Sequence, residues 1–201
     1  MSTMGLVYDV ICRRRTVRRF QQKSIPEEML MRLVNAARLA PSGANLQPCE
    51  YIVVTDIQLA ATVFPHLKWA GYLAPHGVPH EGEKPTAYIL VLIDLHKRKK
   101  GGEVDAAAAI ENILIAAAEE HLGGCWIGSL DRKKIKKLLR IPHHIKIDSV
   151  VALGYANEKP VVEDLQHSVK YWRDEKDVLH VPKRRLEDIC FINGYVYSGN
   201  D

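Results

Sequence analysis

The sequence predicts an α+β fold in which a mixed β-sheet is flanked by helices. Helical and strand-like segments interleave along the chain, the loops between them are irregular, and the residues from Asn157 onward show no dominant period. No glycine-rich turn follows a strand and opens a helix, which disfavours a doubly wound parallel sheet. No internal repeat or linker divides the 201 residues, so we expect one domain, 1–201, that ends in an extended tail, 157–201.

Four elements are expected before the middle of the chain. Apolar residues at helical spacing predict a helix over Leu6–Arg14 and a second helix that starts around Pro26 and ends before Pro41. The β-branched run Tyr51–Thr55 predicts a strand, and Ile57–Phe64 is expected to be helical.

A loop that contains Gly and Pro throughout, Lys68–Lys84, leads into the second half of the chain. The elements expected there are a buried strand Tyr88–Leu92, an alanine-rich helix Asp105–His121 that Gly123 and Gly124 end, an extended piece Cys125–Ser129, a helix Arg132–Arg140 capped by Asp131, and a strand Val150–Tyr155.

The composition excludes several classes of protein. With 47% hydrophobic and 26% charged residues the chain is not disordered, and a net charge of +4 permits a polyanionic partner without requiring one. The four cysteines form no CxxC pair, so neither a zinc site nor a disulfide framework is predicted. We see no signal peptide, and the most apolar segment, Ala106–Ala118, is too short to span a membrane. We therefore expect a cytoplasmic protein with no membrane partner.

Two cationic motifs stand near opposite ends of the chain. In RRRTVRRF, Arg14, Thr16 and Arg18 alternate, so in an extended segment they share one face, and such a face suits a phosphate group. In PKRRL, Lys183 and Arg185 alternate in the same way and could converge on the same phosphate. The alternatives are a solvated basic turn or nucleic-acid patch for the first motif, and a surface tail for the second.

Two further motifs combine backbone access with short polar or apolar groups. PSGANLQP places Ser42, Gly43 and Asn45 between two prolines, which makes a stiff loop rich in hydrogen-bonding groups. In GGCWIGSLD, Gly128 and Ser129 let the backbone approach a flat ligand, beside the apolar pair Trp126 and Ile127. The alternative for GGCWIGSLD is a helix stop followed by a buried strand.

In their order along the chain the four motifs resemble the FMN-dependent nitroreductase family, and the resemblance extends to the segments LRIP and VVALGYANEKP. RRRTVRRF is similar to the family's arginine–serine–arginine opening, with Thr16 in place of serine. PSGANLQP resembles the family's Pro-Ser-small-x-Asn-x-Gln-Pro loop, although Cys49 stands where an aromatic residue is usual. The resemblance implies a mainly antiparallel sheet and a domain-swapped homodimer, with the tail against the partner subunit.

The resemblance also implies two FMN molecules, each at the subunit interface. Arg14, Thr16, Lys183 and Arg185 would hold the phosphate, Arg15 would lie beside the ribityl chain, and Pro41, Ser42, Gly43 and Asn45 would come from the other subunit. Trp126 and Ile127 would back the ring. Arg18 at the pyrimidine edge and the amides of Gly128 and Ser129 near flavin N5 are the expected catalytic groups.

The leading functional hypothesis is transfer of a hydride from NAD(P)H through FMN to a small-molecule acceptor, such as a nitroaromatic compound or a quinone, in a ping-pong cycle. In the loop before Tyr88, Lys68, Trp69 and Tyr72 are the candidate substrate residues. This hypothesis needs no metal and no nucleic-acid partner. The rivals are a family member specialised for dehalogenation or metabolite oxidation, a non-catalytic FMN-binding protein, and a basic nucleic-acid-binding protein.

Two histidine pairs carry little weight as ligands. His76 and His80 stand among Pro75, Gly77 and Pro79, which argues against a helical metal site. His143 and His144 follow Pro142 and are expected to face solvent.

Overall fold

A computed structural model describes residues 5–74 and 76–195, and the contacts within the chain group it into two compact units, Met1–Lys159 and Pro160–Asp201. The first unit holds the main sheet and all five α-helices of the described residues. The second unit starts close to where the sequence predicts the tail. The placement of that tail against a partner subunit stays a prediction.

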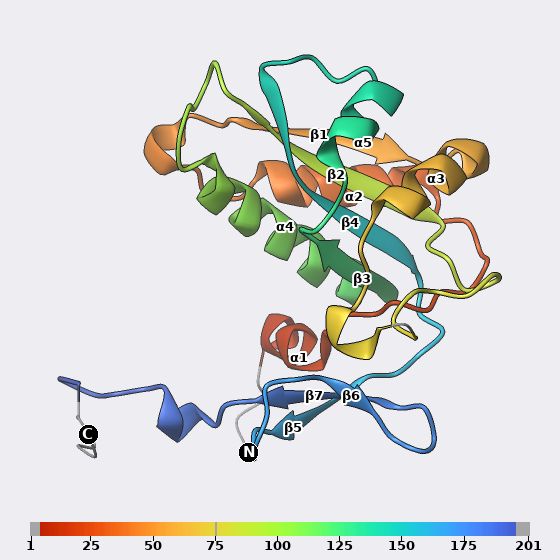
Figure 1. Cartoon of the computed structure of the whole chain (residues 1–201). Helices are drawn as coiled ribbons and strands as arrows, with labels where there is room; N and C mark the ends of the chain where they lie inside the picture. The colour runs from red at the N-terminus through yellow and green to blue at the C-terminus, as the bar shows by residue number, and fades with distance from the viewer. Residues whose placement is uncertain (1–4, 75, 196–201) are drawn as a thin grey trace. The chain divides into compact units, whose positions relative to one another are not determined.

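The main sheet has four antiparallel strands in the order β1-β2-β4-β3 (Figure 1). Their bounds are Cys49–Val54 for β1, Ala87–Asp94 for β2, Leu122–Ile127 for β3 and Ile145–Tyr155 for β4. The predicted α+β class with a mainly antiparallel sheet is confirmed. β1 and β3 form the two opposite edges of this sheet.

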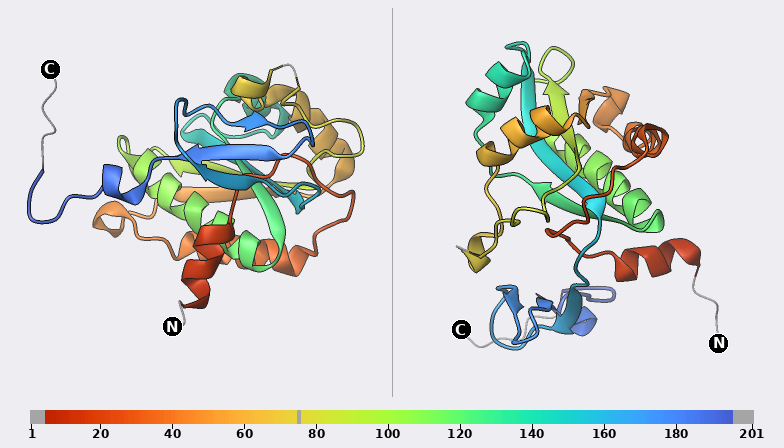
Figure 2. Two further views of the ribbon diagram at one scale, coloured as in Figure 1. Left: turned by 90° about the horizontal axis from the view of Figure 1, so that it is seen from below. Right: turned by 90° about the vertical axis from the view of Figure 1, so that its right-hand side faces the viewer.

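Helices cover both faces of the sheet, as the right-hand view of Figure 2 shows. β2 alternates between two hydrophobic clusters, because successive side chains of a strand point to opposite faces. Ile89 and Val91 pack with α2 (Glu27–Arg38) and α4 (Gly102–Glu119), and Tyr88 and Leu90 pack with α3 (Ile57–Val63) and α5 (Arg132–Leu138). All eight residues of β2 are buried as a result.

The alanine-rich helix is α4, and its small side chains allow close packing. Ala106, Ala109 and Ala117 are buried with Ile110 and Ile113 between α2 and the sheet. A single turn then leads into β3, so the predicted glycine stop is wrong: Gly123 and Gly124 lie inside the strand.

Most other element boundaries agree with the sequence to within a few residues. Asp131 caps α5 as predicted, because its carboxylate accepts a hydrogen bond from the backbone N–H of Lys134 at 3.1 Å. Helix α1 (Leu6–Arg13) contributes only Val10 to the core, and its large apolar residues Leu6, Val7, Tyr8 and Ile11 are exposed.

The second unit has a small sheet of its own, with strand order β5-β7-β6. β5 (Val161–Asp164) pairs parallel with β7 (Leu179–Lys183), and β6 (Trp172–Arg173) pairs antiparallel with β7. Within the described residues no helix has the length and apolar character needed to cross a membrane.

Candidate functional site

The arginine-rich motif and the GGCWIGSLD motif lie side by side. After α1 the chain runs extended, Thr16 forms a parallel bridge with Gly124 of β3, and the backbone N–H of Val17 donates to the Gly124 carbonyl at 3.1 Å. Farther along, Phe20 bridges to Ala156 after β4. The segment therefore lies along the edge strand β3, with two of the four predicted motifs joined by backbone pairing.

The cations of this segment have different protein neighbours. Arg14 Nε lies 3.4 Å from Glu111 Oε1 on α4, and among the described residues this buried N–H makes no hydrogen bond. The guanidinium of Arg15 donates to the carbonyl of Cys12, and burial lowers the pKa of Arg15, with a smaller contribution from neighbouring Arg14.

The backbone of Arg18 is anchored by a carboxylate. Its N–H donates to Glu158 Oε1 at 2.5 Å, and the N–H of Arg19 donates to the same oxygen at 3.2 Å. The pair of bonds fixes the backbone of the basic segment.

Gly128 and Ser129 follow β3 and are exposed, with both carbonyls fixed by the protein. The carbonyl of Gly128 accepts from Arg132 Nη2 at 2.9 Å, and that of Ser129 accepts from the backbone N–H of Lys68 at 3.0 Å. Arg132 also donates to the carbonyls of Ile147 and Asp148. The sequence predicts only that Arg132 begins a helix, and no local pattern indicates that its side chain binds these carbonyls.

Trp126 and Ile127 face opposite sides of the edge strand, as strand geometry requires. Trp126 is 41% exposed, and its indole N–H donates to Ser149 Oγ at 2.8 Å. Ile127 is buried in the cluster beneath α3 and α5. Of the two, only Trp126 offers side-chain surface on the open face, so a role for Ile127 at a ligand rests on its backbone.

The predicted substrate residues likewise differ in whether their side chains are exposed or buried. Exposed Lys68 is close to Ser129 through the backbone bond given above, and Tyr72, in the short 3₁₀ helix Gly71–Leu73, is 55% exposed. Trp69 is only 7% exposed and packs in the core, with its ring centroid 5.5 Å from that of Phe64. The expectation that Trp69 lies on an acceptor pocket does not fit this burial.

The PSGANLQP loop is strained and tied to α4. Ala44, Asn45 and Gln47 all have left-handed backbone, with φ of 51°, 53° and 48°. Ser42 Oγ accepts from the backbone N–H of Gln47 at 3.0 Å and donates to Asp105 Oδ2 at 3.2 Å. The loop precedes β1, so in one chain it belongs to the opposite edge of the sheet from Trp126 and Gly128.

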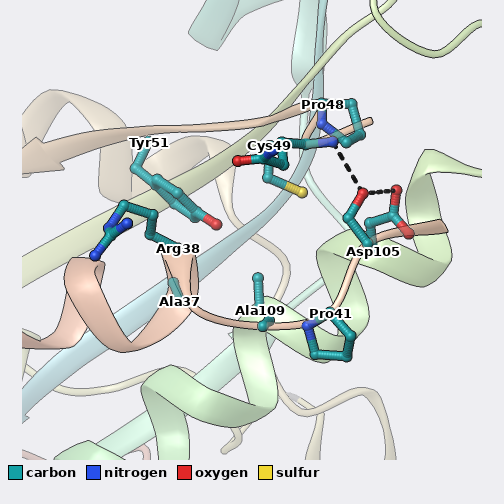
Figure 3. Close-up of a pocket in the computed structure, with 11 residues that line it drawn as sticks. Ala37, Arg38, Pro41, Pro48, Cys49, Tyr51, Asp105 and Ala109 are labelled. Atoms are coloured by element: carbon teal, nitrogen blue, oxygen red, sulfur yellow. Dashed lines mark hydrogen bonds between the residues drawn. The ribbon is translucent and has the colours of Figure 1, made fainter. Parts of the chain in front are cut away.

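A cavity of about 140 Å³ lies between this loop, β1, α2 and α4. Cys49, Tyr51 and Asp105 line it (Figure 3). Burial, and to a smaller extent the charge of Asp105, raises the pKa of the Cys49 thiol to about 11, so this thiol stays protonated at neutral pH. Cys49 is therefore a poor nucleophile, and it lies at this cavity in the position where the resemblance leads one to expect an aromatic ring.

The remaining predicted cations lie in the second unit. Lys183 ends β7 and is exposed, and Arg185 pairs with Glu187 at 3.4 Å and Asp188 at 3.2 Å. The prediction that they share a phosphate with Arg14 and Thr16 stays a prediction.

One group of potential metal ligands was missed by sequence reasoning. Asp94, His96 and His144 bring three ligand atoms within 4.8 Å of one another, and the two imidazoles stack with centroids 4.3 Å apart. His144 is half-buried against His96 and does not simply face solvent. Because the pairing of β2 with β4 creates this contact, no local sequence pattern reveals it.

Comparison with known proteins identifies the class. Residues 11–155 match the model of the nitroreductase family. A Methanothermobacter thermautotrophicus protein named "Putative NADH dehydrogenase/NAD(P)H nitroreductase" is 33% identical over 165 residues, which cover 79% of this chain and 82% of the relative. The chain therefore belongs to the nitroreductase family and is an oxidoreductase of that family.

Two further comparisons bear on the ligand and the reaction. An iodotyrosine deiodinase from Thermotoga neapolitana is 27% identical over 183 residues, which cover 84% of this chain and 98% of the relative. A crystal structure of a "putative nitroreductase in complex with fmn" from Desulfovibrio desulfuricans subsp. superposes with a TM-score of 0.67 at 25% identity, covering 82% of this chain and 94% of that one.

Proposed function

We propose that this chain is an FMN-dependent oxidoreductase that takes a hydride from NAD(P)H and reduces a small oxidised acceptor, such as a nitroaromatic compound or a quinone. Family membership and the name of the Methanothermobacter relative support the donor and the acceptor class. The observation that carries the proposal is the pairing of Thr16 with Gly124, because it joins the cationic segment to the exposed edge at Trp126, Gly128 and Ser129.

The residues along this edge fit a flavin nucleotide. The buried N–H of Arg14, which makes no hydrogen bond among the described residues, has donor capacity for a phosphate oxygen. The exposed indole of Trp126 offers an apolar surface, and the fixed carbonyls of Gly128 and Ser129 hold their peptide planes in one orientation. This combination of cations, hydroxyl, indole and ordered backbone matches the chemical parts of FMN.

The chain's own groups would then have distinct roles. Arg14 and Thr16, with Lys183 and Arg185, would hold the phosphate, and Arg15 would lie along the ribityl chain. Arg18 would stabilise negative charge at the pyrimidine edge, and the backbone N–H groups of Gly128 and Ser129 would orient toward N5. When bound, FMN supplies the ring that receives the hydride and passes it on. Donor and acceptor would use the same open face in turn, which is a ping-pong cycle.

The active unit would be a homodimer. Ser42, Gly43 and Asn45 lie at the β1 edge and Trp126 at the β3 edge, so a second chain would bring the two groups to one flavin. The apolar side chains that α1 exposes, Leu6, Val7, Tyr8 and Ile11, are suited to burial in such an interface.

A spectroscopic experiment tests the activity. We expect the purified protein to be yellow, to lose its flavin absorbance when NADH or NADPH is added without air, and to recover it when a nitroaromatic compound or a quinone follows. Colourless protein that FMN cannot reconstitute would refute the proposal. Yellow protein that neither nicotinamide reduces would instead identify a flavin carrier or a different electron donor, and salt-sensitive binding of nucleic acid to the apoprotein would favour the basic-patch rival.

A second candidate function is reductive dehalogenation, which the deiodinase relative favours. The two functions share the flavin and differ in the acceptor. Release of iodide from iodotyrosine, measured beside nitroaromatic reduction with the same reduced protein, distinguishes them.

A further inference from the structure

Asp105 is a buried carboxylate that holds the PSGANLQP loop from beneath. It lies in the first turn of α4 and is only 5% exposed. Its Oδ1 accepts from the backbone N–H of Gly43 at 3.0 Å, and its Oδ2 accepts from Ser42 Oγ at 3.2 Å. Both partners belong to the loop that the proposed function assigns to the flavin of the other subunit.

Arg98 balances the charge of Asp105 and lies against Gly43, one of the two loop residues that Asp105 binds. Arg98 Nη1 donates to Asp105 Oδ2 at 2.7 Å, and Arg98 Nε donates to the carbonyl of Lys100 at 3.1 Å. A Cβ atom on Gly43 would lie 2.4 Å from Arg98 Nη1, so the guanidinium rests directly on the glycine. The carboxylate thus has three donors, two from the loop and one from Arg98.

A buried ion pair is weak evidence for stability, because the cost of removing two charges from water offsets their attraction. A fully satisfied buried polar network does specify one local arrangement. Here that arrangement contains three non-glycine residues in the left-handed region within four positions, Ala44, Asn45 and Gln47. Such backbone persists only where surrounding contacts enforce it.

We propose that Asp105, charge-balanced by Arg98, is a positioning residue: it holds Ser42, Gly43 and Asn45 in the conformation that contacts the flavin of the partner subunit. The inference rests on the proposed function and extends it to two residues that the proposed function does not assign to the cofactor. Its physical content is preorganisation, because the loop is ordered before FMN binds and the cost of ordering is not subtracted from FMN affinity.

Asp105→Asn is the direct test, with Glu103→Gln as the matched control. Glu103 lies in the same first turn of α4 and pairs with Lys146 at the surface, so its substitution removes one carboxylate from the same helix without touching the loop. In Asp105→Asn we expect hydrogen exchange at the Gly43 and Gln47 amides to speed up in the apoprotein, and the Kd for FMN to rise on the order of tenfold. Glu103→Gln should match the wild type in both measurements.

The double variant Asp105→Asn/Arg98→Met separates positioning from stability. Removing both charges leaves no unpaired buried ion, so the thermal midpoint should recover toward that of the wild type. Exchange at Gly43 and the Kd for FMN should stay altered, because the loop has still lost its anchor. Wild-type exchange and affinity in Asp105→Asn, or recovery of both in the double variant together with the midpoint, would overturn the inference. A wild-type protein that does not bind FMN would overturn the proposed function instead, and the exchange measurement in the same variants would still decide whether Asp105 anchors the loop.

Discussion

Val17 donates its backbone N–H to the carbonyl oxygen of Gly124 at 3.1 Å, and this bond sets the arginine-rich segment beside β3. The approach is this close because the strand lacks a Cβ atom at Gly123, while the missing Cβ at Gly124 makes room for α4. A Cβ on Gly123 would lie 2.7 Å from Val17 Cβ, and one on Gly124 would lie 2.6 Å from Leu114 Cδ2. Two motifs that are far apart in the sequence thus meet where glycine is the residue that fits.

Gly123→Ala should therefore push the arginine-rich segment off the strand. Val17 Cβ is next to the backbone and cannot swing aside, so we expect a loss of about 1–3 kcal/mol in the free energy of unfolding, measured by urea denaturation. Gly71→Ala is the control, because among the described residues a Cβ built there would have no atom within 4 Å outside its own local backbone and chain neighbours. Equal stability of the two variants would contradict the packing argument.

Gly123 and Gly124 are predicted to end the alanine-rich helix but lie inside β3, and this difference shows which structural features the local sequence can predict. A glycine pair after an alanine-rich run is typical of a helix stop, and nothing local announces that Val17 needs the space. The same limit applies to the contact of Arg98 with Asp105, which depends on how the chain returns between β2 and α4. The order of elements and the Asp131 cap are predictable because periodicity and capping are local properties, whereas the antiparallel sheet is predicted only through the family resemblance.

Alanine at Arg14 should weaken FMN binding if the phosphate lies beside this side chain. Loss of one charge-assisted contact costs roughly 1.5–3 kcal/mol, which is a tenfold to hundredfold rise in Kd. Arg13→Ala is the matched control, because Arg13 is the neighbouring exposed cation. The same comparison applies at the other end of the chain, with Arg185→Ala against Arg184→Ala.

The double variant Arg14→Ala/Arg185→Ala tests whether both cations serve one phosphate. The effects of two residues that share a partner are not additive. The loss of binding free energy in the double variant should therefore differ from the sum of the losses in the two single variants. FMN retention equal to wild type in both single variants would place the phosphate elsewhere.

Intersubunit complementation tests the homodimer. If each flavin site takes Arg14 from one chain and Asn45 from the other, a mixed dimer of Arg14→Ala and Asn45→Ala contains one intact site and one doubly altered site. Each mixed dimer should bind about half as much FMN as the wild type. After random exchange about half of the dimers are mixed, so the mixture should regain about a quarter of the wild-type FMN binding, although each variant alone binds weakly. No recovery in a proven mixed dimer would show that one chain supplies both groups. A monomer with full FMN occupancy in sedimentation would rule out the shared site.

His180 gives the second unit a pH dependence. Its Nδ1 lies 2.9 Å from Glu163 Oε2, its Nε2 lies 3.3 Å from Asp174 Oδ2, and its ring stacks on Trp172. The hydrogen bond with Glu163 is the largest cause that raises the pKa of His180 above its ordinary 6.5, and the pKa values of Glu163 and Asp174 are lowered. The histidine contribution to stability is therefore complete below about pH 6.5 and is lost as the pH rises through the raised pKa.

At low pH, the stability that this cluster contributes is limited by the protonation of Glu163 and Asp174. Their contribution is present above their ordinary pKa values of 4.5 and 3.8 and is lost as the pH falls through the lowered ones. An NMR titration of the full chain should thus give His180 a pKa above 6.5, and Glu163→Gln should lower it. Glu175→Gln, beside Asp174, should leave the titration unchanged. A His180 pKa at or below 6.5 in the wild type would show that the ring does not hold its two carboxylates in solution.

Trp69 and Tyr72 lie three residues apart in the loop before β2 and should behave in opposite ways. Trp69 is packed in the core against Phe64, so Trp69→Ala should cost about 3–5 kcal/mol of stability, and any change in activity should follow from that loss.

Tyr72 is exposed, and the backbone bond between Lys68 and Ser129 holds the start of this loop beside the proposed N5 side of the flavin. Tyr72→Ala should therefore keep its stability and its bound FMN while the relative rates for a panel of quinones and nitroaromatics change. Tyr72→Phe separates the ring from the hydroxyl, since a stacking role survives it and a hydrogen-bonding role does not. Identical acceptor profiles for the wild type and Tyr72→Ala would assign the loop to scaffolding and move the choice of acceptor to other residues of the edge.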